Sequence, residues 1–230
     1  MEKLYTAVGR FQYKEHTVGG KDYPKVILKN KELILDIQEM IVWSVLNWRI
    51  LPVEHIKALY NHKIIELDFY SQRSFEECLC RLIQRGLVAE GIGDQPIDAL
   101  YDLLSDLYII PISDSLLLKF ISFIRLTVFY NRPYSVTKKL LKRDKRSADE
   151  SKVIMLAKQA TLSTAEIINC ISKDKLILKN DKDILDTLYY DKYTTSDNIS
   201  AATRYLRECH PVLTSIANLY LRKQLIFERV

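Results

Sequence analysis

The segment CLCRLIQRGLVAEG, residues 78–91, decides the fold that the sequence predicts. Its first part has the apolar spacing of a helix, with Leu79 and Leu82 on one face. Gly86 can adopt the positive φ that commonly ends a helix, and the apolar run after it is typical of a strand. We therefore expect a helix over residues 71–85 that turns sharply into a strand.

Two amphipathic helices are predicted before this segment. Residues 36–48 have apolar side chains at helical spacing, with Asp36 as N-cap and Glu39 completing a capping box. Another helix starts near Pro52, which suits the first turn. Three helices followed by a strand and a Gly-containing turn are the order of a winged helix-turn-helix domain.

The two flanking regions differ in character. Residues 1–32 are rich in Tyr, Val, Thr and Phe and contain a Gly-Gly pair at 19–20, which predicts an N-terminal β-hairpin. Residues 98–112 and 114–131 have strong apolar stripes and are predicted as helices that pack between modules. With the basic stretch that follows, they give a helical basic linker over 98–146.

The last third of the chain repeats this plan loosely. Moving residues 36–59 along by 112 positions places them on 148–171, with matching apolar positions. RLIQRGLVAE resembles NLYLRKQLIFE at 218–228, so that Arg85-Gly86 falls on Lys223-Gln224. We predict two winged-helix modules, residues 33–97 and 147–230. Two amphipathic helices can also match to this degree by chance.

Composition places the chain among ordinary globular proteins. It has 230 residues, 48% hydrophobic and 27% charged, with no apolar signal segment at the start. Its densest apolar run is interrupted by Lys119 and Arg125, so no membrane contact is expected. The four cysteines show no disulfide framework, which is typical of a cytoplasmic protein.

Charge is distributed unevenly along the chain. Residues 1–113 carry 13 basic and 16 acidic side chains, a net charge of −3, whereas residues 114–230 carry 21 and 13, a net charge of +8. Six of the basic residues fall within 138–146. The second half is therefore the better candidate for contact with a polyanion, and a solvated basic surface is the alternative.

The pattern of an apolar helix, Arg-Gly, an apolar pair and Glu resembles tandem winged helix-turn-helix DNA-binding proteins of the bacterial transcriptional-regulator type. The resemblance covers roughly residues 33–93 and 147–230. It implies a mainly α fold with small β elements, a homodimer, and a double-stranded DNA partner. It also implies a transcriptional regulator, or a replication or mobile-element factor, rather than an enzyme. In this family the third helix commonly enters the major groove.

Carried onto this sequence, the third helices would be residues 71–85 and 211–223. Arg, Asn and Gln side chains on them suit base edges, and nearby Lys, Arg, Ser and Thr suit phosphates. Two features of the first module depart from the family pattern: helix 71–85 carries the acidic pair Glu76 and Glu77, and the predicted wing AEGIGDQ, residues 89–95, carries acidic and no basic residues. The candidate DNA-binding residues are Gln72, Arg73, Arg81, Lys138, Lys139, Lys142, Arg143, Lys145, Arg146, Arg204, Arg207, Thr214, Ser215, Asn218 and Arg222.

An alternative function is that of a protein-interaction adaptor, since tandem winged helices also serve that role. The acidic first half, with a protein partner, fits this alternative better. Neither a metal nor a cofactor is expected: Cys78 and Cys80 point in different directions on a helix, and His55 and His62, seven residues apart, have no supporting carboxylate in a metalloprotease spacing. No phosphate loop, nucleophile elbow or catalytic carboxylate pair is apparent.

Overall fold

The computed structural model describes residues 1–12, 24–67, 73–112, 145–189 and 193–229. These residues form a mixed α/β structure in which about half are helical and a fifth lie in strands. The strands make three small antiparallel sheets. The prediction of a mainly α chain thus underestimated the β content, because several strands have only two to four residues and carry little sequence pattern.

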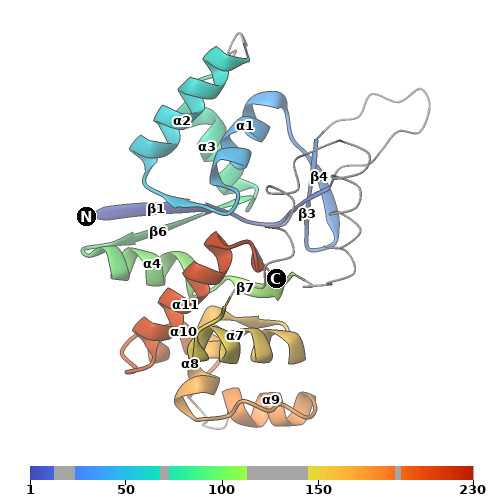
Figure 1. Ribbon diagram of the computed structural model, residues 1–230, viewed down its shortest axis with the longest axis vertical. Coiled ribbons are helices and arrows are strands. Elements are labelled where there is room, and N and C mark those ends of the chain that lie inside the picture. Colours follow the sequence, from blue (N-terminus) through green and yellow to red (C-terminus); the bar gives the residue numbers. More distant parts are fainter. Residues whose placement is uncertain (13–23, 68–72, 113–144, 190–192, 230) are drawn as a thin grey trace, which may run out of the picture.

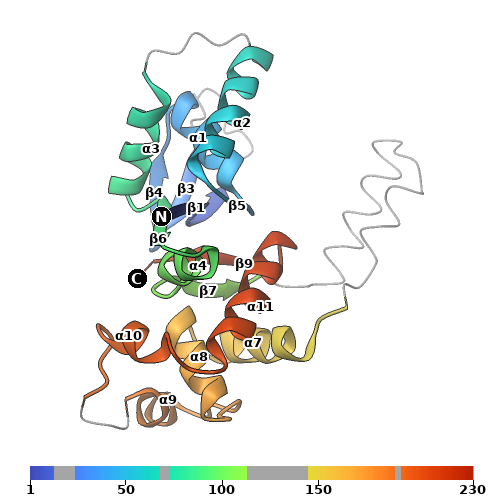
Figure 2. The same cartoon turned by 90° about the vertical axis from the view of Figure 1, so that its left-hand side faces the viewer.

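The first unit, residues 1–104, is a sheet with helices on both faces. Its strands are β1 (Glu2–Ala7), β5 (Ile50–Leu51) and β6 (Val88–Gly93), ordered β5-β1-β6. Three helices cover one face and a fourth covers the other (Figures 1 and 2). They are α1 (Ile37–Leu46), α2 (Val53–Glu66) and α3 (Phe75–Gln84) on the first face, and α4 (Pro96–Leu104) on the second.

Local signals set these helix ends. Asp36 and Glu39 form the predicted capping box of α1, and Ser74 forms one with Glu77 at the start of α3. Gly86 has φ +73° just after α3, as predicted, and lets the chain turn into β6. Helix α3 therefore begins later than the predicted residue 71.

The second unit, residues 105–229, contains the other sheet and the remaining helices. Its sheet has the order β8-β7-β9, from β7 (Tyr108–Pro111), β8 (Leu162–Ser163) and β9 (Leu225–Glu228). Its helices are α7 (Ala148–Gln159), α8 (Thr164–Ser172), α9 (Asp181–Leu188), α10 (Ile199–Thr203) and α11 (Cys209–Leu221).

Both units follow one topological plan. In each, the strand that comes first in the chain becomes the middle strand, followed by a helix, a two-residue edge strand, further helices and the other edge strand. The ends of α3 and α11 also match: Leu87 donates to the Leu82 carbonyl and Gln224 to the Leu219 carbonyl, both at 2.9 Å. The connection from α8 to α11 is longer, because α9 and α10 occupy it.

The register of this repeat differs by one residue from the sequence prediction. Arg85 corresponds to Arg222 rather than to Lys223, since each is the C-cap of its helix. Lys223 then corresponds to Gly86, and it too has a positive φ of 59°. The predicted register was wrong because it aligned the apolar pairs Leu87-Val88 and Leu225-Ile226, and not the helix ends.

A second correction concerns residues 98–112, predicted as one helix. Helix α4 ends at Leu104, and β7 follows after a short turn. Strand β7 pairs with both β8 and β9, and its β-branched Ile109 is fully buried between them. A short apolar run of this kind has no periodicity that separates a strand from a helix. The predicted helix 114–131 lies outside the described residues.

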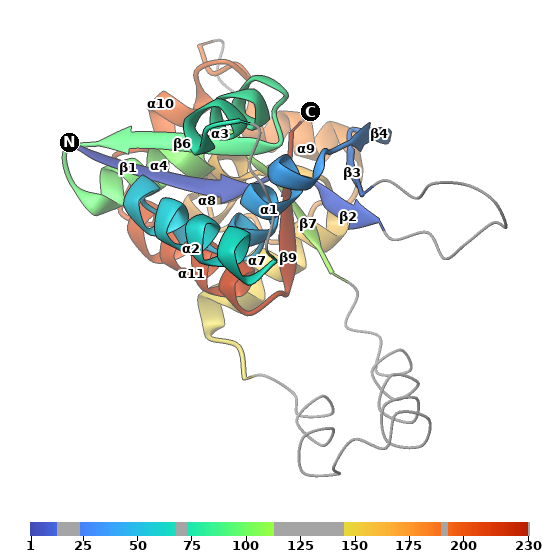
Figure 3. The ribbon, with the colours of Figure 1, turned by 90° about the horizontal axis from the view of Figure 1, so that it is seen from above.

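The N-terminal β region forms a sheet of its own. Strands β2 (Arg10–Gln12), β3 (Lys25–Leu28) and β4 (Lys31–Ile34) pair in that order, at the end of β1 away from the N-terminus (Figure 3). Lys29 and Asn30, with φ of 52° and 60°, form the tight β3–β4 turn. The hairpin predicted over 1–32 is not confirmed, since β1 pairs elsewhere and Gly19-Gly20 lie outside the described residues.

The two units share one continuous apolar core. The hydroxyl of Tyr220 on α11 reaches into the first unit, where it accepts hydrogen bonds from Thr6 (3.0 Å) and from the Trp48 amide (2.9 Å). The Gly9 amide donates to the Phe227 carbonyl at 2.9 Å. The C-terminal strand β9 therefore lies against the N-terminal β region. No helix among the described residues is long and apolar enough to cross a membrane.

Candidate nucleic-acid interface

Helix α11 presents a polar stripe that is free of acidic side chains. Its apolar face, which includes Val212, Ile216 and Leu219, is buried and packs mainly on α7 and α8. Thr214 and Asn218, four residues apart, are exposed on the other side. Hydroxyl and carboxamide groups can donate to and accept from base edges or phosphates without breaking an existing ion pair.

Helix α3 occupies the equivalent place in the first unit but presents a different surface. Glu76 pairs with Lys57 on α2 at 2.6 Å, and Glu77 is held by its capping box. Arg81 donates to Glu39 on α1 at 2.9 Å. The charged groups of this helix are therefore satisfied within the chain, and two of them are acidic.

A buried carboxylate ties the first and third helices together in the first unit. The Glu39 side chain is only 2% exposed and accepts hydrogen bonds from Arg81 (2.9 Å) and Arg85 (2.7 Å). Arg73 pairs with Asp36 at 2.5 Å. Burial alone would raise the pKa of Asp36, but hydrogen bonds from the Glu39 amide and from Arg73 hold that pKa below its ordinary value.

The second unit has the same arrangement at corresponding positions. Glu150 completes a capping box with Ser147 at the start of α7 and pairs with Arg222 at the end of α11. Its carboxylate is 7% exposed. Arg146 donates to the Gln224 side chain at 2.5 Å. We call these two carboxylates, Glu39 and Glu150 with their arginines, the helix latches.

Five of the predicted DNA-contacting arginines thus have partners within the chain. In addition to the four above, Arg204 pairs with Asp98 of α4 at 3.2 Å and lies over the Tyr101 ring, so it joins the two units. Ser215 is buried and donates to the Pro211 carbonyl. The predicted residues whose side chains already have partners within the chain are Arg73, Arg81, Arg146, Arg204, Arg222 and Ser215.

Five predicted residues are exposed in the structure: Arg81, which pairs with Glu39, and Lys145, Arg207, Thr214 and Asn218. Lys145 immediately precedes α7, and its carbonyl accepts a hydrogen bond from Arg222 at the end of α11. Arg207 lies in the turn between α10 and α11, since α10 ends at Thr203. Gln72, Lys138, Lys139, Lys142 and Arg143 lie outside the described residues.

Two features were missed in the sequence. Lys223 is exposed beside the end of α11, with its ammonium 5.2 Å from the Trp48 ring centre. Lys173, Lys175 and Lys179 line a hollow of about 720 Å³ beside α9, together with Asp183 and Asp186. The only sequence signal for this hollow was the clustering of lysines within residues 173–179, which is also common on solvated surfaces.

Within the ranges that the structure describes, no group of three or more His, Cys, Asp or Glu side chains could hold a metal ion. All four cysteines are free thiols. Comparisons with protein-family models, with curated proteins and with solved structures found no match. The residues themselves must therefore carry the functional argument.

Proposed function

We propose that this chain is a tandem winged-helix protein that binds duplex DNA through its second unit. The proposal rests on the topology that both units share, in which α3 or α11, at the place of the third helix of a winged-helix domain, turns into an edge strand of the sheet. In winged-helix proteins that helix is commonly presented to the major groove. Helix α11 would read bases with Thr214 and Asn218, and a role in transcription, replication or a mobile element follows from this activity.

The surface difference between α3 and α11 is the observation that carries the choice of unit. DNA carries dense negative charge, so an acidic recognition surface is disfavoured. Helix α3 exposes Glu76 and Glu77, whereas α11 has no acidic side chain. Lys145, Arg207 and Lys223 are exposed cations near the ends of α11 and would contact phosphates. The sequence has four more basic residues shortly before Lys145: Lys138, Lys139, Lys142 and Arg143.

A protein-adaptor function is the second candidate, and the first unit favours it. Helix α2 and the residue after it expose Ile65 (80%) and Leu67 (57%), beside acidic Glu66. Apolar side chains with an acidic neighbour suit a basic amphipathic partner. A protein with this adaptor function would not bind nucleic acid at physiological salt.

The test is fluorescence anisotropy with a mixed-sequence duplex of about 30 base pairs, at salt concentrations between about 50 and 200 mM. We expect binding that weakens steeply as salt rises. The double variant Thr214→Ala/Asn218→Ala should lose about tenfold or more in affinity, because each lost base contact removes about 1 to 3 kcal/mol.

The matched control is Cys80→Ala/Gln84→Ala, two exposed positions four residues apart on α3. It should bind like the parent protein. Equal losses in both double variants, or no binding at the lowest salt, would reject the assignment to α11; absence of binding would favour the adaptor function.

A further inference from the structure

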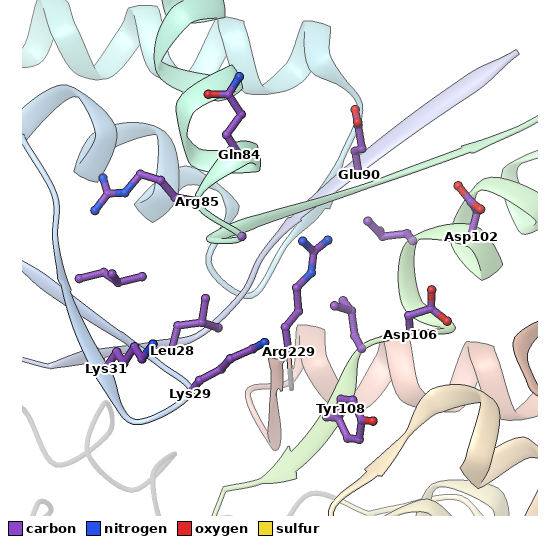
Figure 4. Close-up of a pocket in the computed structure, with 14 residues that line it drawn as sticks. Leu28, Lys29, Lys31, Gln84, Arg85, Glu90, Asp102, Asp106, Tyr108 and Arg229 are labelled. Carbon is purple, nitrogen blue, oxygen red and sulfur yellow. The ribbon is translucent and has the colours of Figure 1, made fainter. Parts of the chain in front are cut away.

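A cavity of about 780 Å³ lies between the two units (Figure 4). Its walls come from the β3–β4 turn, the end of α3, strand β6, the end of α4, β7 and Arg229 after β9. A second hollow of about 310 Å³ adjoins it and shares Lys29, Tyr108 and Arg229. A volume of this size suits a small organic ligand.

One wall of the cavity carries cations without protein partners. Within the described parts of the chain, the side chains of Lys29, Lys31 and Arg229 make no hydrogen bond or ion pair. Arg85 differs, because it is held by Glu39 and by the Ile34 carbonyl and points away from the cavity (Figure 4). Three unpaired cations around one hollow repel each other, and an anion would relieve that repulsion.

The opposite wall carries acceptors. Glu90, Asp102 and Asp106 line it, and Asp102 already accepts a hydrogen bond from the Ile92 amide at 2.8 Å. Tyr108 lines both this cavity and the smaller hollow. A ligand that fills the cavity therefore needs an anionic end and a separate end with hydrogen-bond donors.

We propose that this cavity binds a nucleoside phosphate. The phosphate would lie against Lys29, Lys31 and Arg229, where charge-assisted hydrogen bonds are strong. The base would stack on Tyr108, since every nucleobase offers a π-face. Ribose hydroxyls or an exocyclic amine would donate to Asp106. A DNA strand fits less well, because its successive phosphates would approach the carboxylates.

This site is separate from the proposed DNA surface on α11, and its test needs no DNA. Isothermal titration calorimetry of the full chain with AMP, GMP, CMP and UMP should show saturable binding of at least one nucleotide. The parent nucleoside and inorganic phosphate, each alone, should bind at least tenfold more weakly, because each uses only one wall.

Lys29→Ala/Arg229→Ala should lower nucleotide affinity by about a hundredfold, tenfold for each cation. Lys3→Ala/Lys158→Ala removes the same charge from exposed positions outside the cavity and should leave affinity unchanged. The proposal is overturned if no nucleotide binds at millimolar concentration, if both double variants lose affinity equally, or if inorganic phosphate binds as tightly as the nucleotides.

Discussion

In each unit, a buried glutamate near the start of one helix holds an arginine at the end of another. Glu39 binds Arg81 and Arg85, and Glu150 binds Arg222. Each carboxylate also accepts a hydrogen bond from the backbone amide of its helix's N-cap residue, Asp36 for Glu39 and Ser147 for Glu150. One side chain therefore completes the start of one helix, α1 or α7, and fixes the position of another, α3 or α11.

Glu39→Gln should lower the free energy of unfolding by about 2 kcal/mol, because glutamine can still serve the capping box but cannot pair with two arginines. Urea denaturation would measure the change. Glu76→Gln is the matched control, since it breaks only the exposed pair with Lys57 and should change stability by less than about 0.5 kcal/mol. Equal losses in the two variants would contradict a structural role for the latch.

The buried hydroxyl of Tyr220 should make the stability of the folded protein depend on pH in the alkaline range. Burial raises its pKa from 10.0 to about 12, although hydrogen bonds from Thr6 and the Trp48 amide oppose the rise. Because the folded state favours the neutral phenol, its contribution to stability is complete below pH 10.0 and is lost as pH rises towards 12.

We therefore expect the melting temperature to fall between pH 10 and 12, measured by circular dichroism. Tyr220→Phe should be less stable at neutral pH by about 1 kcal/mol, because the Trp48 amide loses its acceptor while Thr6 can still donate to the Arg49 carbonyl. The variant should also be less sensitive to alkali. Tyr101, whose pKa burial also raises to about 12, should preserve part of that sensitivity. An unchanged alkaline slope in Tyr220→Phe would contradict this assignment.

At the scale of elements, α4 packs so closely on β6 that the strand needs glycine. A Cβ on Gly91 would lie 2.3 Å from the Leu103 amide nitrogen and 2.4 Å from the Ala99 carbonyl oxygen. A Cβ on Gly86 would meet nothing nearer than a Leu28 methyl at 3.6 Å, although φ there is +73°. The two glycines are thus required for different reasons.

Gly91→Ala should cost more than about 3 kcal/mol, because backbone atoms cannot move aside without separating α4 from the sheet. Gly86→Ala should cost about 1 to 2 kcal/mol, the penalty of a left-handed conformation. Thermal unfolding of both variants tests this order. A Gly91→Ala protein as stable as Gly86→Ala would show that the contact of α4 with β6 is looser than described.

The sequence predicted elements best where local chemistry determines them. The capping box at Asp36 and Glu39 and the stop at Gly86 depend on neighbouring residues, and both predictions were confirmed. Strand β7 was missed because its identity depends on β8 and β9, which come more than 50 positions later in the chain. The one-residue error in the repeat has a different cause, since the apolar pairs after α3 and α11 match in a register that the C-caps Arg85 and Arg222 do not share.

At the scale of the whole molecule, the candidate site shows what a sequence cannot reveal. Arg81 and Arg222 have the residue type expected of DNA contacts, yet their carboxylate partners lie on distant parts of the chain. Thr214 and Asn218 were predicted with them and are exposed. The net charge of residues 114–230 is +8, which is consistent with the proposal that the second unit contacts a polyanion.

The measurement that tests the central claim most directly is hydrogen–deuterium exchange with and without a DNA duplex, at low salt. The account predicts that the duplex slows exchange in peptides covering α11 and the basic stretch before α7, and leaves peptides from α3 unchanged. Protection on α3 instead, or a duplex that binds without protecting α11, would contradict the proposal that the second unit reads DNA.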